Sequence, residues 1–354
     1  MNSGYASGGP PPMPPTQQQS FGSQQGQTQS GYFKYSQCNG RKKALLIGIN
    51  YIGQSAALQG CIEDVNRMKR FLLSRGYKEQ DMVTLKDDSK HPRERPTRQN
   101  ILEAMQWLVR DARPNDSLFF HYSGHGGQTK DLDGDEGDGY DEVIYPVDFK
   151  TNSHIVDDTM YKIMVSSLPA GCRLTAIFDS CHSGSALDLP YIYSTEGKIK
   201  EPNVAMGAAK GLMSTLTSLQ RSDVGGVMSG VTGLIKVASG NAQKADQRAK
   251  ATRSSHADAI SWSGCKDSQT SADASIGGRN TGAMSDVRLH ASDPVLFLTP
   301  LSTMQAFLTA LERNPNPSYQ QLLVDIRRVL SNKYSQKPQL SSSHPIDTNI
   351  QFII

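Results

Sequence analysis

Two apolar runs of strand length, each ending in a polar turn, constrain the fold of this chain more than any other feature. The first, Ser117–Tyr122, runs into Ser-Gly-His-Gly-Gly, and the second, Thr175–Phe178, runs into Asp-Ser-Cys-His-Ser-Gly. Short apolar runs are typical of buried parallel strands, and open α/β sheets keep reactive groups at the carboxyl ends of such strands. If the two strands are parallel neighbours, His125 and Cys181 lie at corresponding ends. The sequence therefore predicts a base and a nucleophile within reach of each other.

A thiol becomes an effective nucleophile when a neighbouring base increases its thiolate fraction, and histidine is the usual base. The glycines Gly126 and Gly127 after His125 let a substrate approach closely. Two other histidines compete for the role of base. His182 follows the cysteine directly and would point away from it, whereas His121 lies inside the apolar run, where we expect it to be buried. The pattern favours a Cys–His dyad.

Apolar runs and helical patterns alternate along the chain, which indicates an α/β fold, a sandwich with a central, mostly parallel sheet. Thr97 is a suitable N-cap for one helix, and Gly76 a suitable stop for another. The predicted strands are 41–50, 82–85, 117–122, 172–178, 257–265 and 349–354, and the predicted helices are 60–73, 97–111, 303–312 and 318–331.

Length and composition exclude several classes of protein. The 354 residues are ample for one α/β domain, and the five cysteines form no C-x-x-C pair, so neither a disulfide framework nor a zinc ribbon is indicated. A net charge of +3 is too small to imply nucleic-acid binding. No apolar stretch approaches the ~20 residues of a membrane span, and the N-terminus has no signal pattern. We expect a soluble, intracellular protein, in the cytoplasm or also in the nucleus.

Composition divides the chain into four parts. Residues 1–40 are rich in Pro, Gln, Gly and Ser, so we predict a disordered arm, with self-association through its Gln-rich sequence as the alternative. Residues 41–190 form a large part with the two turns. Residues 191–256 are rich in Gly, Ser, Ala, Lys and Arg with weak periodicity, which predicts a flexible basic linker. Residues 257–354 form a small part.

Three motifs together resemble those of the fungal type I metacaspases, cysteine peptidases with a caspase-like fold and a Pro/Gln-rich N-terminal extension. The motifs are His-Tyr-Ser-Gly-His-Gly from His121, Asp-Ser-Cys-His-Ser-Gly from Asp179, and Ser-Gly-Cys-Lys-Asp-Ser-Gln-Thr-Ser-Ala-Asp from Ser263. The separation of the dyad, 181 − 125 = 56 residues, is close to the roughly 50 residues of caspases. The resemblance covers roughly residue 42 to the C-terminus and implies a caspase-like α/β/α sandwich.

The resemblance also implies a role for each residue that matches a family motif. Cys181 would attack the scissile carbonyl, His125 would protonate the leaving amine, and the backbone N–H groups of Gly126 and Cys181 would bind the oxyanion. A pocket for a substrate Arg or Lys side chain is implied as well, and its carboxylates suit a cation. Its lining would be Cys61, Asp64, Ser123 and Asp179. Without the family, Asp64 reads as an exposed helix carboxylate and Asp179 as a turn residue.

The acidic stretch 131–142 has two calcium interpretations. As an EF-hand it has Asp at its first, third and fifth positions and Glu142 at the twelfth, but Glu136 replaces the required glycine and a strand-like Val-Ile-Tyr follows. We judge this match accidental, and a solvated loop fits 131–138 equally well. The resemblance implies a different Ca²⁺ site and activation by calcium as cofactor. Its ligands would be Asp141, Asp157, Asp158 and Asp188.

Cleavage after Arg or Lys would let the enzyme process its own linker, so that a zymogen matures by autocatalytic cleavage. The candidate sites are Lys198, Lys200, Lys210, Arg221 and Lys236. The family further implies protein substrates with Arg or Lys at the cleaved position and a monomeric catalytic domain. A role in apoptosis is not decided by the sequence.

Residues 286–303 interrupt the small part, and 286–301 have no counterpart in the family. We hypothesise an intron retained in the gene sequence or a lineage insertion, and sequencing the transcript distinguishes the two. A non-proteolytic function is the alternative to peptidase activity: the Gln-rich arm would direct a scaffold or clearance factor to aggregates. Cys181→Ala would separate these functions, because it would abolish cleavage and leave association intact.

Overall fold

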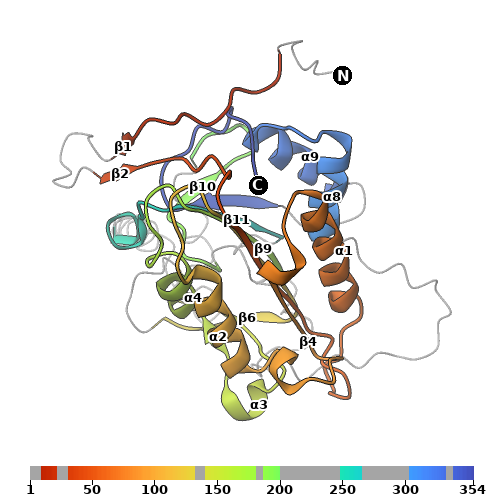
Figure 1. Cartoon of the computed structure of the whole chain (residues 1–354). Coiled ribbons are helices and arrows are strands. Elements are labelled where there is room, and N and C mark those ends of the chain that lie inside the picture. The colour runs from red at the N-terminus through yellow and green to blue at the C-terminus, as the bar shows by residue number, and fades with distance from the viewer. Residues whose placement is uncertain are drawn as a thin grey trace, which may run out of the picture.

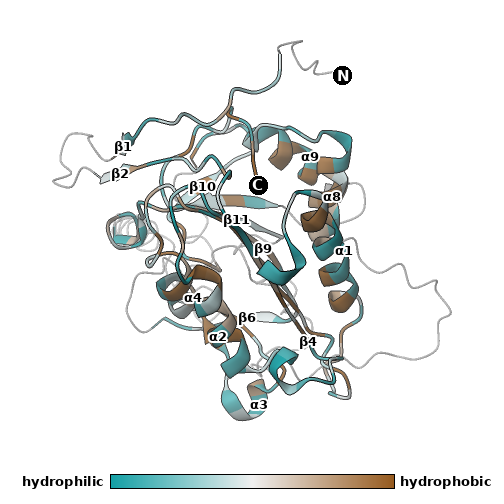
Figure 2. Ribbon diagram, viewed as in Figure 1, coloured by the Kyte–Doolittle hydropathy of each residue, from teal (hydrophilic) through white to brown (hydrophobic). Residues whose placement is uncertain are grey.

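The computed structural model describes residues 9–21, 31–131, 140–180, 186–199, 248–264, 303–331 and 338–354. Within these ranges, helices cover both faces of a central sheet (Figure 1). This is the predicted α/β sandwich. Each face of the sheet packs against its own hydrophobic cluster, and the apolar sides of the helices turn toward the sheet (Figure 2).

The central sheet runs in the order β10-β12-β11-β9-β5-β3-β4. The strands from β11 to β4 are parallel, whereas β12 and β10 pair antiparallel. Their bounds are β3 Lys42–Gly48, β4 Met82–Lys86, β5 Ser117–Ser123, β9 Arg173–Asp179, β10 Tyr191–Tyr193, β11 Asp258–Ser263 and β12 Gln339–Ser342. All of β5 is buried, as expected for a parallel strand covered on both faces.

Helices α1, α8 and α9 pack on one face of the sheet, and α2 and α4 on the other. Alternate residues divide between the faces because side chains of a strand alternate: Leu46 of β3 belongs to the first cluster, and Leu45 and Ile47 to the second. The helices are α1 Cys61–Ser74, α2 Arg98–Val109, α3 Phe149–Asn152, α4 Asp157–Met164, α8 Thr303–Arg313 and α9 Tyr319–Ser331, and the 3-10 turns are η1 Glu79–Asp81 and η2 Pro92–Glu94.

A second, antiparallel sheet carries the end of the acidic stretch. It consists of β6 Gly126–Lys130, β7 Tyr140–Ile144 and β8 Ile155–Val156. Residues 132–139 lie outside the described residues. A strand follows them where an EF-hand requires a helix, which agrees with rejecting that motif.

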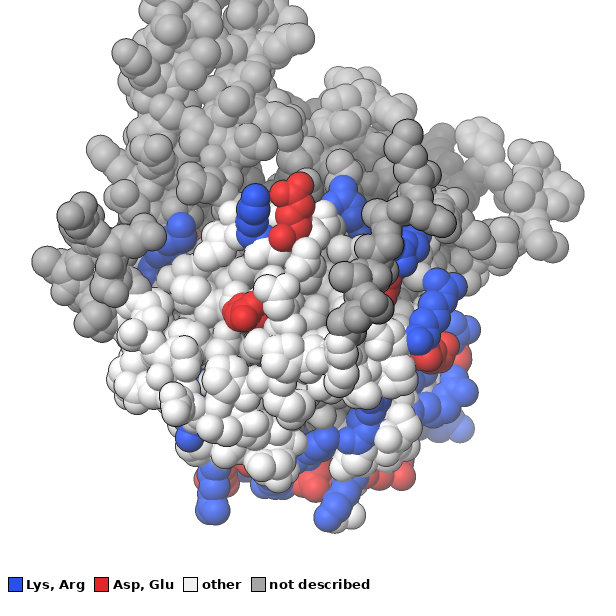
Figure 3. Space-filling view, turned by 90° about the horizontal axis from the view of Figure 1, so that it is seen from above, with Lys and Arg blue, Asp and Glu red and all other residues white. Residues whose placement is uncertain are grey.

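The prediction of a disordered arm over residues 1–40 is wrong for residues 19–21 and 31–40, which form paired strands or pack against the domain. Strand β2, Gly31–Phe33, pairs with β1, Gln19–Phe21. Phe33 stacks on His344 with ring centroids 3.6 Å apart, and Tyr35 is buried. These aromatic side chains supply apolar surface that the average composition of the arm conceals. Figure 3, which views the molecule from above, shows few charged side chains across the middle of the described surface, whereas Lys, Arg, Asp and Glu gather along its right and lower edges.

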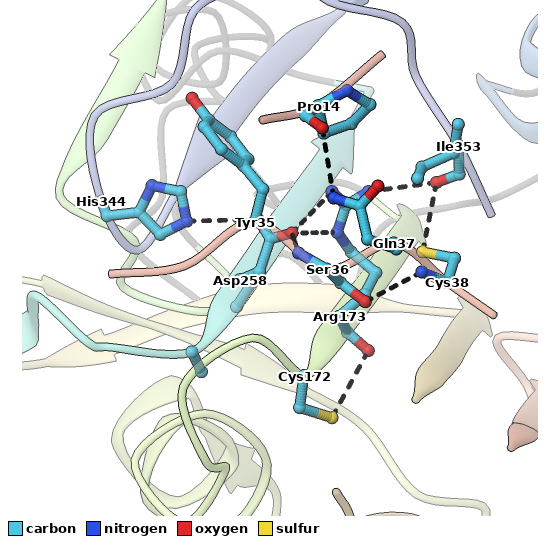
Figure 4. A network of polar contacts seen from close by, with 12 residues as sticks. Pro14, Tyr35, Ser36, Gln37, Cys38, Cys172, Arg173, Asp258, His344 and Ile353 are labelled. Atoms are coloured by element: carbon cyan, nitrogen blue, oxygen red, sulfur yellow. Dashed lines mark hydrogen bonds and ion pairs between the residues drawn. The ribbon is translucent and has the colours of Figure 1, made fainter. Parts of the chain in front are cut away.

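A buried network of charged groups joins distant parts of the chain at the amino ends of β9 and β11 (Figure 4). Arg173 Nη2 lies 2.7 Å from Asp258 Oδ2, and both side chains are fully buried. His344 Nε2 lies 3.1 Å from Asp258 Oδ1. The backbone N–H of Ser36 donates to Asp258, and Arg173 donates to the carbonyl of Ile353. The network therefore ties the arm, the large part and the small part together.

Two predicted boundaries need correction at the ends of the small part and the linker. Residues 349–354 form no strand: the one β-pairing among them is an isolated bridge from Gln351 to Ser318. Phe352 nevertheless packs into the core. The last strand is β12, whose sequence Gln-Leu-Ser-Ser lacks an apolar pattern although it is buried. The predicted linker 191–256 is shorter, because it begins with β10 and residues 248–253 are helical. None of the described helices has the length and apolarity to cross a membrane.

Candidate active site

The two turns singled out in the sequence follow adjacent parallel strands. In the register of β5 and β9, Ser123 lies opposite Asp179. His125 comes two residues after the first of these and Cys181 two residues after the second. The predicted pairing of the strands is therefore confirmed. Cys181 itself lies outside the described residues.

Tyrosine hydroxyls fix the backbone of His125. Its N–H donates to Tyr51 Oη over 3.1 Å, and Tyr122 Oη donates to its carbonyl over 2.7 Å. The rings of Tyr51 and His125 lie 4.6 Å apart. Tyr51 has a φ of 51°, in the left-handed region that is rare for an aromatic residue. Such a conformation persists only where the surroundings enforce it, which indicates that packing and hydrogen bonds hold Tyr51 in place beside His125.

The imidazole of His125 is oriented by a backbone carbonyl. Its Nε2 lies 2.8 Å from the carbonyl oxygen of Ala56. A carbonyl oxygen can only accept, so Nε2 carries the ring hydrogen and Nδ1 keeps the lone pair. Nδ1 is therefore the atom that can take a proton from a thiol. Once the ring is protonated, the bond to Ala56 becomes charge-assisted and stronger.

Burial argues against one competing base and two competing nucleophiles, His121, Cys61 and Cys172. Burial lowers the pKa of His121 to about 3, so this histidine stays neutral inside β5. Burial likewise raises the pKa of Cys61 and of Cys172 to about 12 each, so both remain thiols. The prediction that His121 is buried is confirmed. Cys265 and His182 lie outside the described residues.

The four residues predicted to line the substrate pocket come together. Ser123 Oγ donates to Asp64 Oδ2 over 3.4 Å. The carboxylates of Asp64 and Asp179 and a hydrogen bond from Ser123 all act on the thiol of Cys61, which places the four side chains in one neighbourhood. Cys61 and Asp64 come from α1, and the other two from the carboxyl ends of β5 and β9.

The start of α8 borders this pocket. Gln305 Nε2 donates to Asp64 Oδ1 over 3.2 Å, and the backbone N–H of Thr303 donates to Asp179 Oδ1 over 3.2 Å. Burial raises the pKa of Asp64, and the Gln305 amide partly offsets that rise. Two carboxyl groups thus lie in one neighbourhood at the edge of the sheet where β5 and β9 end.

The predicted calcium ligands form a second acidic site. One carboxylate oxygen each of Asp141, Asp157 and Asp158 lies within 4.8 Å of the others, and the same holds for Glu142, Asp157 and Asp188. We call these five residues the acid cluster. Asp141 and Glu142 come from β7, and Asp157 and Asp158 start α4. Asp188 precedes β10 and has a φ of 46°. All four predicted residues are thus assembled, and Glu142 is an addition.

Asp157 is the centre of the acid cluster. Its Oδ2 accepts from the N–H of Glu142 over 2.7 Å, and its Oδ1 accepts from the N–H of Asp158 over 2.9 Å. Burial raises the pKa of Asp157 to about 6, with the neighbouring charge of Asp158 adding to the rise and the two N–H groups opposing it. Crowded carboxylates of this kind suit a hard cation with oxygen ligands.

Comparison with known proteins identifies the family. A model of the metacaspase peptidase C14 domain matches residues 42–190. Metacaspase-1 of Cryptococcus neoformans is 59% identical over 350 residues, which are 98% of this chain and 72% of that protein. The chain belongs to the metacaspase family. Metacaspase-1 of Ajellomyces capsulatus is 58% identical over 97% of this chain and 91% of its own, and that of Emericella nidulans is 56% identical over 98% and 80%.

Membership of the family makes this metacaspase a cysteine peptidase with a caspase-like fold, as the sequence predicted. The solved structure of a Geobacter sulfurreducens protein aligns with 88% of this chain and 97% of its own, with 20% identity and a TM-score of 0.49. At that similarity the alignment adds nothing to the assignment. The Gly126 predicted for the oxyanion site begins β6, directly after the histidine.

Several functional contacts of the metacaspase escaped the sequence analysis. Tyr51 and Ala56 hold the histidine from a loop without a motif, and Gln305 reaches the pocket from a distant helix.

Of the predicted processing sites, Lys198 is exposed but lies in a turn, since its carbonyl accepts from the N–H of Ser194. The other four, and the segment 286–302, lie outside the described residues.

Proposed function

We propose that this metacaspase is a calcium-activated endopeptidase that cleaves proteins after Arg or Lys and processes its own linker. The observation that carries the proposal is the pair of carboxylates, Asp64 and Asp179, at the sheet edge that also carries His125. A cationic side chain held there would present its own carbonyl to the catalytic turn. Charge-assisted hydrogen bonds of this kind favour Arg and Lys over neutral residues.

The chemistry follows from the tautomer of His125. Nδ1 takes the thiol proton of Cys181, and the thiolate attacks the scissile carbonyl carbon. The C–N bond then breaks as Nδ1–H gives its proton to the leaving amine, which leaves a thioester. A water molecule, deprotonated by Nδ1, hydrolyses the thioester and restores the thiol. Throughout, the Nε2–H bond to Ala56 keeps the ring in place and stabilises its charged form.

Calcium is the second part of the proposal. The acid cluster fits the ion, because its five members are carboxylates from three separate segments and each offers an oxygen within 4.8 Å of two others. A bound Ca²⁺ would supply charge compensation between these segments and would take no part in bond breaking. Asp188 lies seven residues beyond Cys181 in the chain, so an ion bound there would act close in sequence to the nucleophile.

Peptide cleavage tests the catalytic part of the proposal. Fluorogenic peptides with Arg, Lys or Asp at the cleaved position would be compared in millimolar Ca²⁺ and in excess chelator. We expect cleavage of the Arg and Lys peptides alone and only with Ca²⁺. Cys181→Ala and His125→Ala should each reduce kcat/KM by ~10³-fold or more. Cleavage that persists in Cys181→Ala would show that the nucleophile is another residue.

Substitution in the pocket tests specificity separately. Asp64→Asn should lower kcat/KM for the Arg peptide by ~10- to 100-fold, because it removes one charge-assisted hydrogen bond of ~1.5–3 kcal/mol. Glu63→Gln is the matched control, since Glu63 lies next to it on α1 but is exposed and pairs with Arg67. Equal effects of the two substitutions would contradict a specific pocket.

A further inference from the structure

A basic side chain from the end of the linker reaches into the acid cluster. Arg253 belongs to the helical residues 248–253, which lie between the linker and β11. Its Nη2 pairs with Asp158 Oδ1 and lies 3.7 Å from Asp188 Oδ2. The side chain is 12% exposed, so the guanidinium is largely removed from water. A cation carried by the chain itself therefore occupies the neighbourhood of the calcium ligands.

The helix that carries two of the acids also anchors Arg253. The ring of Tyr161, from α4, lies 5.1 Å from the guanidinium carbon, and the Tyr161 hydroxyl donates to the carbonyl of Arg253 over 2.8 Å. Backbone and side chain of the arginine are thus both held against α4. Arg253 therefore supplies a direct attachment of the chain after the linker to the large part.

Arg253 and a divalent ion require the same oxygen atoms. Asp158 and Asp188 each belong to a group that can ligate an ion, and each is in reach of the guanidinium. We propose that Arg253 is an internal competitor of Ca²⁺, which holds the acid cluster until the ion displaces it. This inference rests on the calcium site of the proposed function and adds its regulation.

Competition at one cluster couples calcium to the linker. If Ca²⁺ expels Arg253, residues 248–253 lose the ion pair and the ring contact that Arg253 makes with α4, and the carboxyl end of the linker is held less firmly. By linkage the reverse also holds: any change that weakens the hold of Arg253 on the acid cluster raises the affinity for Ca²⁺. A cavity of about 410 Å³ beside Asp158 and Arg253 gives the side chain room to turn away.

Calcium titration of the full chain tests the inference. Isothermal titration with CaCl₂ would use Cys181→Ala protein, which cannot process itself, with and without Arg253→Gln. We expect Arg253→Gln to bind Ca²⁺ about 5- to 50-fold more tightly, within the usual range of coupling between sites. Arg328→Gln is the matched control: it removes the same charge from α9, where Arg328 pairs with Asp325. Its affinity should equal that of the parent.

Hydrogen exchange supplies a measurement that needs no substitution at Arg253. In the Cys181→Ala parent, Ca²⁺ should accelerate exchange of the amides of residues 248–253, because the ion releases the helix. Unchanged or slower exchange would overturn the inference, as would equal calcium affinity in Arg253→Gln and Arg328→Gln. Asp157→Asn tests the site itself. If neither that variant nor the parent binds Ca²⁺, the calcium part of the proposed function fails as well.

Discussion

Two buried charged clusters in this metacaspase differ in charge balance. At the amino ends of β9 and β11, Arg173 and His344 surround Asp258, and every distance between the paired atoms is about 3 Å. The acid cluster instead brings five carboxylates together, with Arg253 reaching two of them. The first cluster matches its charges, and the second carries an excess of one sign.

The difference separates a structural role from a binding role. A buried carboxylate that is fully paired is costly to disturb, because breaking the pair leaves an uncompensated charge. An excess of carboxylates is costly to keep, and the cost is recovered when a cation binds. We therefore expect substitutions in the first cluster to destabilise the calcium-free protein far more than substitutions in the second.

The largest effect is expected from Asp258→Asn. Arg173 would stay buried without its counter-charge, so the free energy of unfolding should fall by ~3–5 kcal/mol. Urea unfolding of Cys181→Ala protein measures the change. Asp325→Asn, which breaks the exposed pair with Arg328, is the control and should cost less than ~1 kcal/mol. A loss below that of the control would show that the network contributes little.

Acid should weaken the balanced cluster next. Burial alone would raise the pKa of Asp258, but Arg173 and His344 outweigh it and lower the pKa to about 2. The unfolded carboxyl binds its proton near pH 4, so stability is present above pH 4 and is lost as pH falls toward 2. The loss should be ~2 kcal/mol. Unfolding of the parent and of the double variant Arg173→Met/Asp258→Leu from pH 5 to 2 measures it, and the same slope in both would contradict the assignment.

The smallest effect is expected from Asp157→Asn in the acid cluster. The substitution removes one crowded negative charge but also one of the two oxygens that accept from the N–H groups of Glu142 and Asp158. The two effects oppose each other, so the free energy of unfolding of the calcium-free protein should change by less than ~1 kcal/mol. The same urea measurement, in chelator, applies. A loss as large as that of Asp258→Asn would mean that the two clusters are balanced alike, and the comparison would fail.

The sequence predicted the structure best where an apolar run is long enough to be a strand and must be buried. The parallel strands β5 and β9 are continuous apolar runs, so their burial and their pairing were both predictable. The pocket and calcium residues depended on the family resemblance. Without it, Asp64 reads as a surface carboxylate, although it is 6% exposed.

The remainder depended on tertiary packing that no local pattern encodes. The arm looked disordered because its composition is polar, yet Phe33 and Tyr35 bury their rings. Strand β12 was missed because its burial comes from its neighbours and not from apolar residues. Arg253 read as one of many linker cations, since only the fold brings it to the acids. Long-range contacts of this kind require coordinates.

The carbonyl of Ala56 that orients the imidazole belongs to the main chain. Alanine scanning would pass over this position, because the residue is already alanine and any replacement keeps the oxygen. A change in loop length would not be silent: deleting one residue between Tyr51 and Gly60 would move the acceptor while every side chain of the dyad remained. We therefore expect a one-residue deletion in this loop to inactivate the enzyme although all of its recognised motifs stay intact.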